Sequence, residues 1–265
     1  MVISVVTISK NNPALLETIV SVRAQKSAKI QHIIIDGAST DDSFVAAKKL
    51  PNTNPNSAVD TIMVSEPDRG ISNALNKGLM LATGDFVVFM NAGDTFYDDS
   101  TITKVLSVME NRETVIVGNA LMVGRDSSTL REARLDLLFG SQTVWTTVCH
   151  QAVFFPRISA TTCLYNEKLR FAMDLQVYYR LAEMGVQFRA IPLVVCRYKL
   201  GGITSNDELF YTKAMEHYRI RIDFNKHPNI FSFIFVVTKG ILGSLLRRTV
   251  LRRINSSRKM TEHER

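Results

Sequence analysis

Apolar runs of strand length alternate with helical segments through the first hundred residues, and this alternation most constrains what the chain can fold into. Helical spacing of apolar residues follows the start signal Asn12-Pro13 and recurs over 71–82. Strands separated by such helices predict an α/β fold: a mainly parallel, doubly wound sheet with helices on both faces. The expected strands are rich in β-branched residues and cover 2–9 (VISVVTIS), 32–36 (HIIID), 61–65 (TIMVS) and 86–90 (FVVFM).

The pattern after residue 110 is mixed. Helices are expected over 173–184, ended by Gly185, and over 206–225. The expected strands are 114–118, 152–155 and a pair formed by 186–191 and 193–198. No internal repeat and no linker rich in Gly, Pro or Ser interrupts the sequence. It therefore predicts one main domain, residues 1–228, and a C-terminal appendage, residues 229–265.

The net charge of +7 belongs almost entirely to the end of the chain. Residues 239–265 hold eight Lys and Arg against two Glu, a net +6, which leaves about +1 for the first 238 residues. A nucleic-acid-binding domain is expected to carry its own basic face. The charge distribution therefore argues against nucleic acid as a partner.

The appendage contains an apolar stretch of 17 residues, 230–246, interrupted by Lys239. A membrane-spanning helix needs about 20 apolar residues, within a range of roughly 17–25. The arginine pairs that follow, 247–248 and 252–253, favour a helix lying on an anionic membrane surface. A helix packed on the main domain and a spanning helix remain the alternatives.

Cysteine usage and the first residues bear on the compartment. Cys149, Cys163 and Cys196 form no CxxC pair, and an odd number cannot close completely into internal disulfides. We expect three buried, unreactive thiols in a reducing compartment. The opening MVISVVTIS has no basic n-region and no small-residue cleavage site, so no signal peptide is expected.

Polar side chains gather where the predicted strands end. In an open α/β sheet, ligands bind beyond the carboxyl ends of the strands, so these groups are candidates for one site. Each has an ordinary alternative: Asp36 could cap a turn, Asp94 could be a loop carboxylate, and Lys77 could lie on a solvated helix face. The polar segments are 7–11 (TISKN), 36–41 (DGASTD), 65–78 (SEPDRGISNALNKG) and 91–94 (NAGD).

Several familiar site motifs are absent from the sequence. There is no GxGxxG after the first strand, no GxxxxGK[ST], no HExxH and no GxSxG. A phosphate ligand would therefore be held by a metal ion together with isolated basic or amide groups. Mg²⁺ and Mn²⁺ prefer oxygen ligands, often one or two carboxylates plus substrate phosphates. Asp94, after a buried strand, suits that role.

Long stretches of the sequence resemble the family 2 glycosyltransferases, which have the GT-A fold. The resemblance implies a Rossmann-like sheet in a catalytic domain over 1–228, followed by a helical basic tail. Within the family, the sequence looks most like bacterial exopolysaccharide and O-antigen transferases, particularly the colanic-acid-type fucosyltransferase. The matching segments are 5–22, 32–43, 65–94, 149–155 (CHQAVFF), 171–185 (FAMDLQVYYRLAEMG) and 198–205 (YKLGGITS).

The resemblance implies a role for each matching residue. Thr7, Ser9 and Asn11 would line a nucleotide pocket, and Asp36 would contact the base or ribose. The remaining donor-binding residues would lie by the nucleotide, the diphosphate or the donor sugar; they are Asp68, Arg69, Asn73, Asn76, Lys77 and Asn91.

Two carboxylates would perform the chemistry that the resemblance implies. Asn91-Ala92-Gly93-Asp94 occupies the position of the family's Asp-x-Asp motif, so Asp94 alone would hold Mn²⁺ or Mg²⁺. Asp174 would be the catalytic base, although the frequent preceding Glu is Met173 here; its alternative is a helix N-terminal residue stabilised by the helix dipole. His150 and Gln151 would bind the acceptor, and a lone His is otherwise more often structural.

The leading hypothesis is an inverting transfer of a sugar from a nucleotide donor to a lipid-linked oligosaccharide, in bacterial surface polysaccharide synthesis. The enzyme would work on the cytoplasmic face of the inner membrane as a peripheral protein. A sugar-1-phosphate nucleotidyltransferase is a second hypothesis, although the stretch 9–13 lacks the expected glycines. A non-catalytic scaffold is the third, supported by the neutral Asn91.

Overall fold

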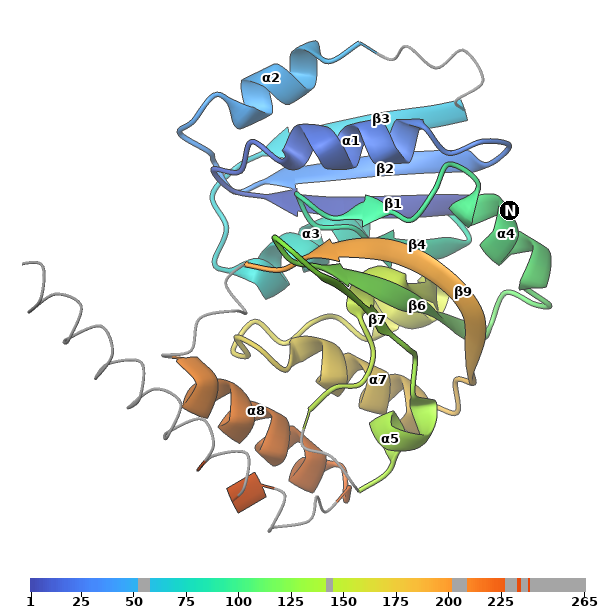
Figure 1. The fold of residues 1–265 in the computed structure, drawn as a ribbon, viewed down its shortest axis with the longest axis vertical. Helices are drawn as coiled ribbons and strands as arrows, with labels where there is room; N and C mark the ends of the chain where they lie inside the picture. Colours follow the sequence, from blue (N-terminus) through green and yellow to red (C-terminus); the bar gives the residue numbers. More distant parts are fainter. Residues whose placement is uncertain (52–57, 142–144, 202–208, 227–232, 235–237, 239–265) are drawn as a thin grey trace, which may run out of the picture.

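The computed structural model describes residues 1–51, 58–141, 145–201, 209–226, 233–234 and 238. Its centre is one curled sheet in the strand order β3-β2-β1-β4-β8-β6-β9-β5, with β7 paired to β6 (Figure 1). The strands are β1 (Val2–Ser9), β2 (Lys29–Asp36), β3 (Ala58–Ser65), β4 (Phe86–Phe89), β5 (Thr95–Phe96), β6 (Val115–Val123), β7 (Ser128–Arg131), β8 (Val153–Pro156) and β9 (Phe188–Lys199).

Helices cover both faces of this sheet, and α1 and α3 lie on opposite sides of β1 to β3 (Figure 1). The period of two along β1 explains this arrangement, because alternate side chains enter different cores. Val6 packs with α3 and α7, whereas Ile3 and Val5 pack with α1 and α4. The helices are α1 (Leu15–Arg23), α2 (Ser43–Lys49), α3 (Ile71–Leu81), α4 (Thr101–Val108), α5 (Leu135–Phe139), α6 (Arg157–Thr162), α7 (Met173–Glu183) and α8 (Phe210–Asp223), with a short 3₁₀ turn, η1 (His150–Ala152).

The first half of the sheet is parallel, as the strand–helix alternation predicts. β3, β2, β1 and β4 all run in one direction, and β8 then pairs antiparallel with β4 and with β6. The expected α/β architecture is confirmed. All three cysteines are buried and unpaired, as the sequence predicts.

One prediction about the sheet is wrong. Residues 186–191 and 193–198 do not form a strand pair, because they lie in the single strand β9, parallel to β6. Pro192 has no N–H to give to a ladder, which suggested a break between two strands. The register shift absorbs it instead: β9 advances from Ala190 to Val194 while β6 advances only from Val117 to Asn119.

The appendage can be described only in small part. The apolar stretch 230–246 lies outside the described residues apart from 233, 234 and 238. In the part of the chain that the structure describes, no helix combines the length and the apolar character needed to cross a membrane.

Candidate active site

The carboxyl ends of β1 and β4 border a pocket where the strand order reverses. The chain leaves β1 for β2 on one side and returns through α3 to β4 on the other. Open α/β sheets bind ligands at such switch points. This switch-point pocket has a volume of about 650 Å³ and is lined by Ile8, Ser9, Lys10, Asn12, Ala14, Asp68, Gly70, Ile71, Ala74, Asn91, Ala92, Gly93, Asp94, Tyr198, Lys199, Leu200 and Gly201.

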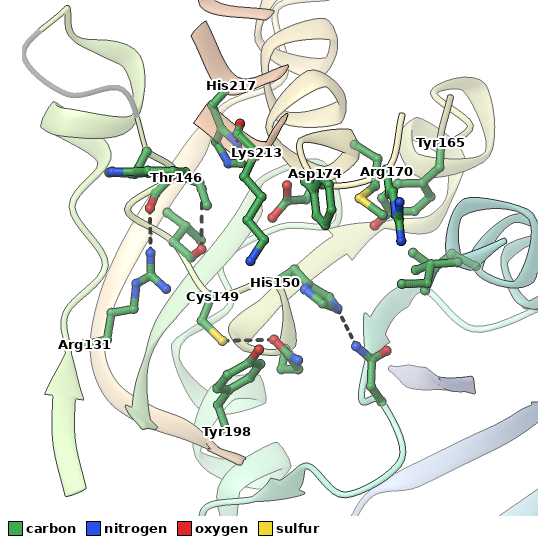
Figure 2. Close-up of a pocket in the computed structure, with 18 of the residues that line it drawn as sticks. Arg131, Thr146, Cys149, His150, Tyr165, Arg170, Asp174, Tyr198, Lys213 and His217 are labelled. Atoms are coloured by element: carbon green, nitrogen blue, oxygen red, sulfur yellow. Dashed lines mark hydrogen bonds between the residues drawn. The ribbon is translucent and has the colours of Figure 1, made fainter. Parts of the chain in front are cut away.

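A second pocket of about 400 Å³ adjoins the first and lies beside the start of α7 (Figure 2). The two pockets share Ile71, Asn91, Tyr198 and Leu200, so these residues form the boundary between them. The polar and aromatic residues that line this α7 pocket include Asn91, Arg131, Trp145, His150, Gln151, Tyr165, Arg170, Phe171, Asp174, Tyr198, Lys213 and His217.

Asp94 lies in the turn between β4 and β5 and is 5% exposed. One carboxylate oxygen accepts a hydrogen bond from Nε2 of Gln151 at 2.7 Å, and the other accepts one from the backbone N–H of Lys199 at 3.0 Å. Burial raises the pKa of Asp94 to about 6, although both hydrogen bonds lower it. At neutral pH the side chain is therefore a carboxylate held in a fixed orientation.

Asn91, in the same turn, offers a second oxygen. Its Oδ1 is buried and has no hydrogen-bond partner among the described residues, while its Nδ2 lies 3.3 Å from Nε2 of His150. A carboxylate and an amide oxygen, with further ligands from substrate phosphates, are suitable for a hard divalent cation. These residues fit a metal that would be completed by the substrate, since the described residues hold no cluster of three His, Cys, Asp or Glu side chains.

Asp174 is the second residue of α7 and lines the α7 pocket. Its Oδ1 accepts a hydrogen bond from the backbone N–H of Leu175 at 2.8 Å. Burial raises the pKa of Asp174 to about 6, against the lowering effects of this hydrogen bond and of Arg131. A carboxylate with a pKa near the operating pH is suited to accept a proton.

His150 reaches the α7 pocket from η1 (Figure 2), and Gln151, in the same turn, also lines this pocket. Burial lowers the pKa of His150 to about 4, so its imidazole is neutral at pH 7. The Sγ of Cys149 donates to Oε1 of Gln151 at 3.0 Å, which turns the Gln151 amide so that its Nε2 faces Asp94. Gln151 thereby links the two pockets, and its role as an acceptor ligand stays a prediction.

The predicted nucleotide residues on β1 and β2 occupy different environments. Ser9 lines the switch-point pocket, whereas Thr7 is fully buried and its Oγ1 lies 2.9 Å from Nε2 of His32. Asp36 is also fully buried and accepts hydrogen bonds from Ser65 Oγ at 2.6 Å and from the backbone of Ser39 at 2.9 Å.

Asn11 acts as a connector between the β1 and β2 loops. It adopts a left-handed backbone conformation with φ of 48°, and its Oδ1 accepts from the backbone N–H of Thr40 at 2.7 Å. Its backbone N–H donates to Oγ of Ser39 at 2.7 Å. None of Thr7, Asp36 and Asn11 lines either of these two pockets. Asp36 and Asn11 instead hold the loop that follows β2.

Asp68 lines the switch-point pocket and pairs with Lys77 across 2.8 Å. The Lys77 ammonium also pairs with Glu66 at 2.8 Å and donates to the carbonyl of Pro67 at 2.8 Å. Because these three partners all lie in the turn before α3, Lys77 stabilises that turn. Lys77 therefore acts on the pocket through Asp68 and does not itself line it.

Arg69, Asn73 and Asn76 connect α3 to the segment before α7. Arg69 pairs with Glu167 at 2.8 Å, and Nδ2 of Asn73 donates to the same carboxylate at 2.9 Å. Asn76 exchanges two hydrogen bonds with the backbone of Tyr165, at 2.8 and 2.9 Å. These three predicted donor ligands lie outside both pockets, and Asn76 fixes Tyr165 in the wall of the α7 pocket.

Several pocket residues carried no predicted role. Arg131 ends β7, Arg170 precedes α7, and Lys213 and His217 lie on α8. Arg221, also on α8, is fully buried and donates to the carbonyl of Trp145 at 3.0 Å, which anchors another wall of the pocket. No motif signals these residues, because they come together only through the packing of α8 against α7.

The fold and the paired pockets define a class: an α/β enzyme whose ligand site lies at a sheet switch point and opens into a second site with its own carboxylate. The sequence profile of glycosyl transferase family 2 matches residues 4–165. The chain therefore belongs to glycosyl transferase family 2, and it is a glycosyltransferase.

Similar sequences occur among mycobacterial proteins. An uncharacterized glycosyltransferase of Mycobacterium tuberculosis is 30% identical over 219 residues, covering 78% of each chain. A PGL/p-HBAD biosynthesis glycosyltransferase of Mycobacterium bovis is 27% identical over 198 residues, covering 73% of each chain. Both alignments are longer than the family match over residues 4–165, so the likeness to these relatives includes part of the chain outside that match.

Two solved structures share the fold. Residues 1–349 of S. aureus TarS, in complex with UDP-GlcNAc, align with a TM-score of 0.61 and 14% identity over 83% of this chain. This chain spans 66% of that TarS segment, just under two thirds of its length. The mannosyltransferase PcManGT from Pyrobaculum calidifontis, in complex with GDP-Man and Mn²⁺, aligns with a TM-score of 0.61 and 18% identity, covering 96% of this chain and 79% of that one. Both support the GT-A fold.

Proposed function

We propose that this glycosyltransferase moves a sugar from a nucleotide donor in the switch-point pocket to a hydroxyl of an acceptor in the α7 pocket, with inversion at the donor carbon. The observation that carries the proposal is the placement of a carboxylate in each of two adjoining pockets: Asp94, which has no ion-pair partner among the described residues, in the first, and Asp174 in the second. The other carboxylate of the first pocket, Asp68, is paired with Lys77. The UDP-GlcNAc and GDP-Man bound to the two structural neighbours support a nucleotide-sugar donor.

Asp174 is the proposed general base. It removes the proton of the acceptor hydroxyl as that oxygen attacks the donor carbon from the α7 pocket. Among the described residues, Asp174 is the only carboxylate that lines this pocket, so no second carboxylate is available there as a nucleophile. This arrangement supports a single displacement, and hence inversion.

Asp94 and Asn91 are the proposed holders of a divalent cation, Mn²⁺ or Mg²⁺. When bound, such an ion supplies positive charge that offsets the charge on a departing diphosphate. The protein's own part is to orient Asp94 through Gln151 and the backbone of Lys199. The buried amide oxygen of Asn91 replaces the first carboxylate of the family motif with a neutral ligand.

The rate of the chemical step is expected to fall as the pH drops through about 6. The base must be ionised to act, and burial raises the pKa of Asp174 to about 6. The measurement is kcat at saturating donor and acceptor between pH 5 and 8. Burial also raises the pKa of Asp94 to about 6, so protonation of Asp94 contributes to the same fall, and the pH profile of Asp174→Asn isolates the contribution of Asp94. A kcat that stays constant down to pH 5 would contradict the assignment to Asp174.

A screen of sugar nucleotides with the purified chain and Mn²⁺ tests the proposed function most directly. Binding is measured by calorimetry, and turnover by release of the nucleoside diphosphate. The fucosyl donor that the sequence resemblance implies stays a prediction. A nucleotidyltransferase would instead release pyrophosphate from a nucleoside triphosphate, and a scaffold would release nothing.

The proposed acceptor is a lipid-linked saccharide in bacterial surface polysaccharide synthesis, presented at the cytoplasmic face of the inner membrane. The support is the sequence of the appendage, whose apolar stretch 230–246 precedes the arginine pairs 247–248 and 252–253. Apart from 233, 234 and 238, these residues lie outside the described residues, so the proposal rests on their composition and charge.

Replacing Arg247, Arg248, Arg252 and Arg253 with Gln should reduce flotation of the chain with anionic liposomes at low salt. Each basic residue near such a surface contributes about 1 kcal/mol, so the four contribute roughly 4 kcal/mol at most. The wild-type chain should also be released by high salt. If neither the substitutions nor high salt weakens binding to the liposomes, a helix inserted in the bilayer is indicated instead. If the wild-type chain does not bind the liposomes at all, membrane association is contradicted.

A further inference from the structure

Basic side chains from three separate elements line the α7 pocket. Arg131 ends β7, Arg170 immediately precedes α7, and Lys213 lies in the first turn of α8. The ring of Phe171 lies between two of them, with the Arg170 guanidinium and the Lys213 ammonium each 5.4 Å from its centroid. Figure 2 shows Lys213 extending from α8 into the pocket that Asp174 and His150 line.

The arginines of this pocket lack the carboxylate partner that four other arginines of the described chain have. Arg69, Arg112, Arg134 and Arg189 each pair with a carboxylate elsewhere in the described chain. Arg131 donates instead to the neutral carbonyl of Thr146, at 2.5 Å. No carboxylate of the described residues lies within ion-pair distance of Arg131 or Arg170.

The pocket therefore carries an excess of positive charge. Three cations line it, and Asp174 is the only carboxylate of the described residues that does. Clefts lined by one sign of charge concentrate ligands of the opposite sign. Removing a proton from an acceptor hydroxyl needs the carboxylate alone, so the positive charge of this lining has no part in that step.

The backbone that carries Arg170 is held in place by α8 before any ligand binds. Glu216 of α8 accepts hydrogen bonds from the backbone N–H groups of Arg170, Phe171 and Ala172, at 3.1, 2.7 and 3.1 Å. Since Lys213 lies one turn before Glu216, α8 both supplies a cation and fixes the loop that supplies another. Groups fixed in this way lose less conformational freedom when a ligand binds.

We propose that the α7 pocket binds a negatively charged group on the acceptor, a phosphate or a carboxylate, through Arg131, Arg170 and Lys213. The proposal rests on the proposed function, in which this pocket holds the acceptor. Guanidinium groups bind either anion with paired hydrogen bonds. At about 400 Å³ the pocket is near the lower end of small-molecule sites, roughly 300–1,000 Å³, so the anion lies on or next to the sugar that is attacked.

Three probes that share one sugar can separate the sources of charge: glucose 1-phosphate, methyl glucuronide and the neutral methyl glucoside. Each is titrated into the full chain by calorimetry, with and without saturating UDP or GDP. At least one charged probe should bind about tenfold more tightly than the neutral one. The better of the two charged probes identifies the anion as a phosphate or a carboxylate.

Arg170→Gln and Lys213→Gln should each lower the binding affinity for the charged probe about tenfold, because each removes one charge-assisted contact. They should leave the affinity for the nucleoside diphosphate and the neutral probe unchanged. Lys168→Gln and Arg219→Gln are matched controls, since both side chains are exposed near the same elements and neither lines the pocket. Melting temperatures of all four variants verify that they fold.

Equal binding of charged and neutral probes to the wild type would overturn the proposal. Displacement of the charged probe by the nucleoside diphosphate would also overturn the proposal, because the probe would then have been bound in the switch-point pocket. Equal weakening by the control variants would overturn it as well. Failure of the proposed function appears separately, as absence of any nucleotide binding, and the titrations without nucleotide still decide whether the α7 pocket binds anions.

Discussion

Asp174→Asn is expected to lower kcat by about 10²–10⁴-fold while leaving the dissociation constant of the donor unchanged. That factor is the usual contribution of a positioned general base. Asp174 lines the α7 pocket and does not line the switch-point pocket, so its loss affects the acceptor proton and leaves the donor contacts intact. Turnover by nucleotide release and donor affinity by calorimetry measure the two effects separately.

The substitution is also expected to leave the fold intact. The hydrogen bond from the Leu175 N–H can be accepted by the amide oxygen of asparagine as well. Glu183→Gln, which neutralises an exposed carboxylate at the far end of α7, is the matched control and should keep wild-type turnover. Unchanged turnover of Asp174→Asn, or an equal loss in turnover and in donor binding, would contradict the base assignment.

The strand ends could be predicted because the physics there is local. Buried apolar runs mark the strands, and the polar residues that follow them must meet at one sheet edge. Ser9, Asn91 and Asp94 accordingly line the switch-point pocket. The sequence is less informative about which side chain at a strand end faces the pocket. Ser9 does, whereas Thr7, two residues earlier on the same strand, contacts His32 of the neighbouring strand.

The second half of the site could be predicted only in part. Asp174 and His150 were identified through the family resemblance, and both line the α7 pocket. The basic residues Arg131, Arg170 and Lys213 follow from no spacing rule, because β7, the segment before α7, and α8 are far apart in the sequence. Their meeting depends on tertiary packing, which a single sequence does not display.

Polar residues on a helix pose a related difficulty. Asn73 and Asn76 both lie on the helix that follows the third strand, and a polar helix face near a ligand site predicts donor contacts. In the structure, Asn76 satisfies the backbone of Tyr165 and Asn73 binds Glu167. Buried polar groups must find partners, and in these positions another loop of the protein supplies them.

Asp94→Asn is expected to lower turnover by about 10²–10³-fold, the scale of losing one preorganised electrostatic contact to a transition state. Asp94 is the single carboxylate of the turn 91–94, because the first acidic position of the family motif is Asn91. Asn91 supplies a neutral oxygen and so leaves no other negative charge in the turn. The measurement is nucleotide release at saturating donor over a range of Mn²⁺ concentrations.

Two opposing effects should keep the melting temperature of Asp94→Asn close to that of the wild type. The folded-state pKa of Asp94 is raised above its unfolded value, so its contribution to stability is greatest at low pH and is lost as the pH rises through about 6. Neutral asparagine removes that penalty at pH 7. Its NH₂ group, however, must face either the Lys199 N–H or Gln151, both of which donate to the carboxylate.

The matched control for this variant is Asp126→Asn, which neutralises an exposed carboxylate outside both pockets and should keep full activity. If the Asp94→Asn protein is folded, has low turnover and needs a different Mn²⁺ concentration, the result supports the assignment of Asp94 as the residue that holds the cation at the diphosphate. Near wild-type turnover at every Mn²⁺ concentration would show that the metal assignment of Asp94 is wrong. The buried carboxylate would then serve only to connect η1, through Gln151, to the end of β9.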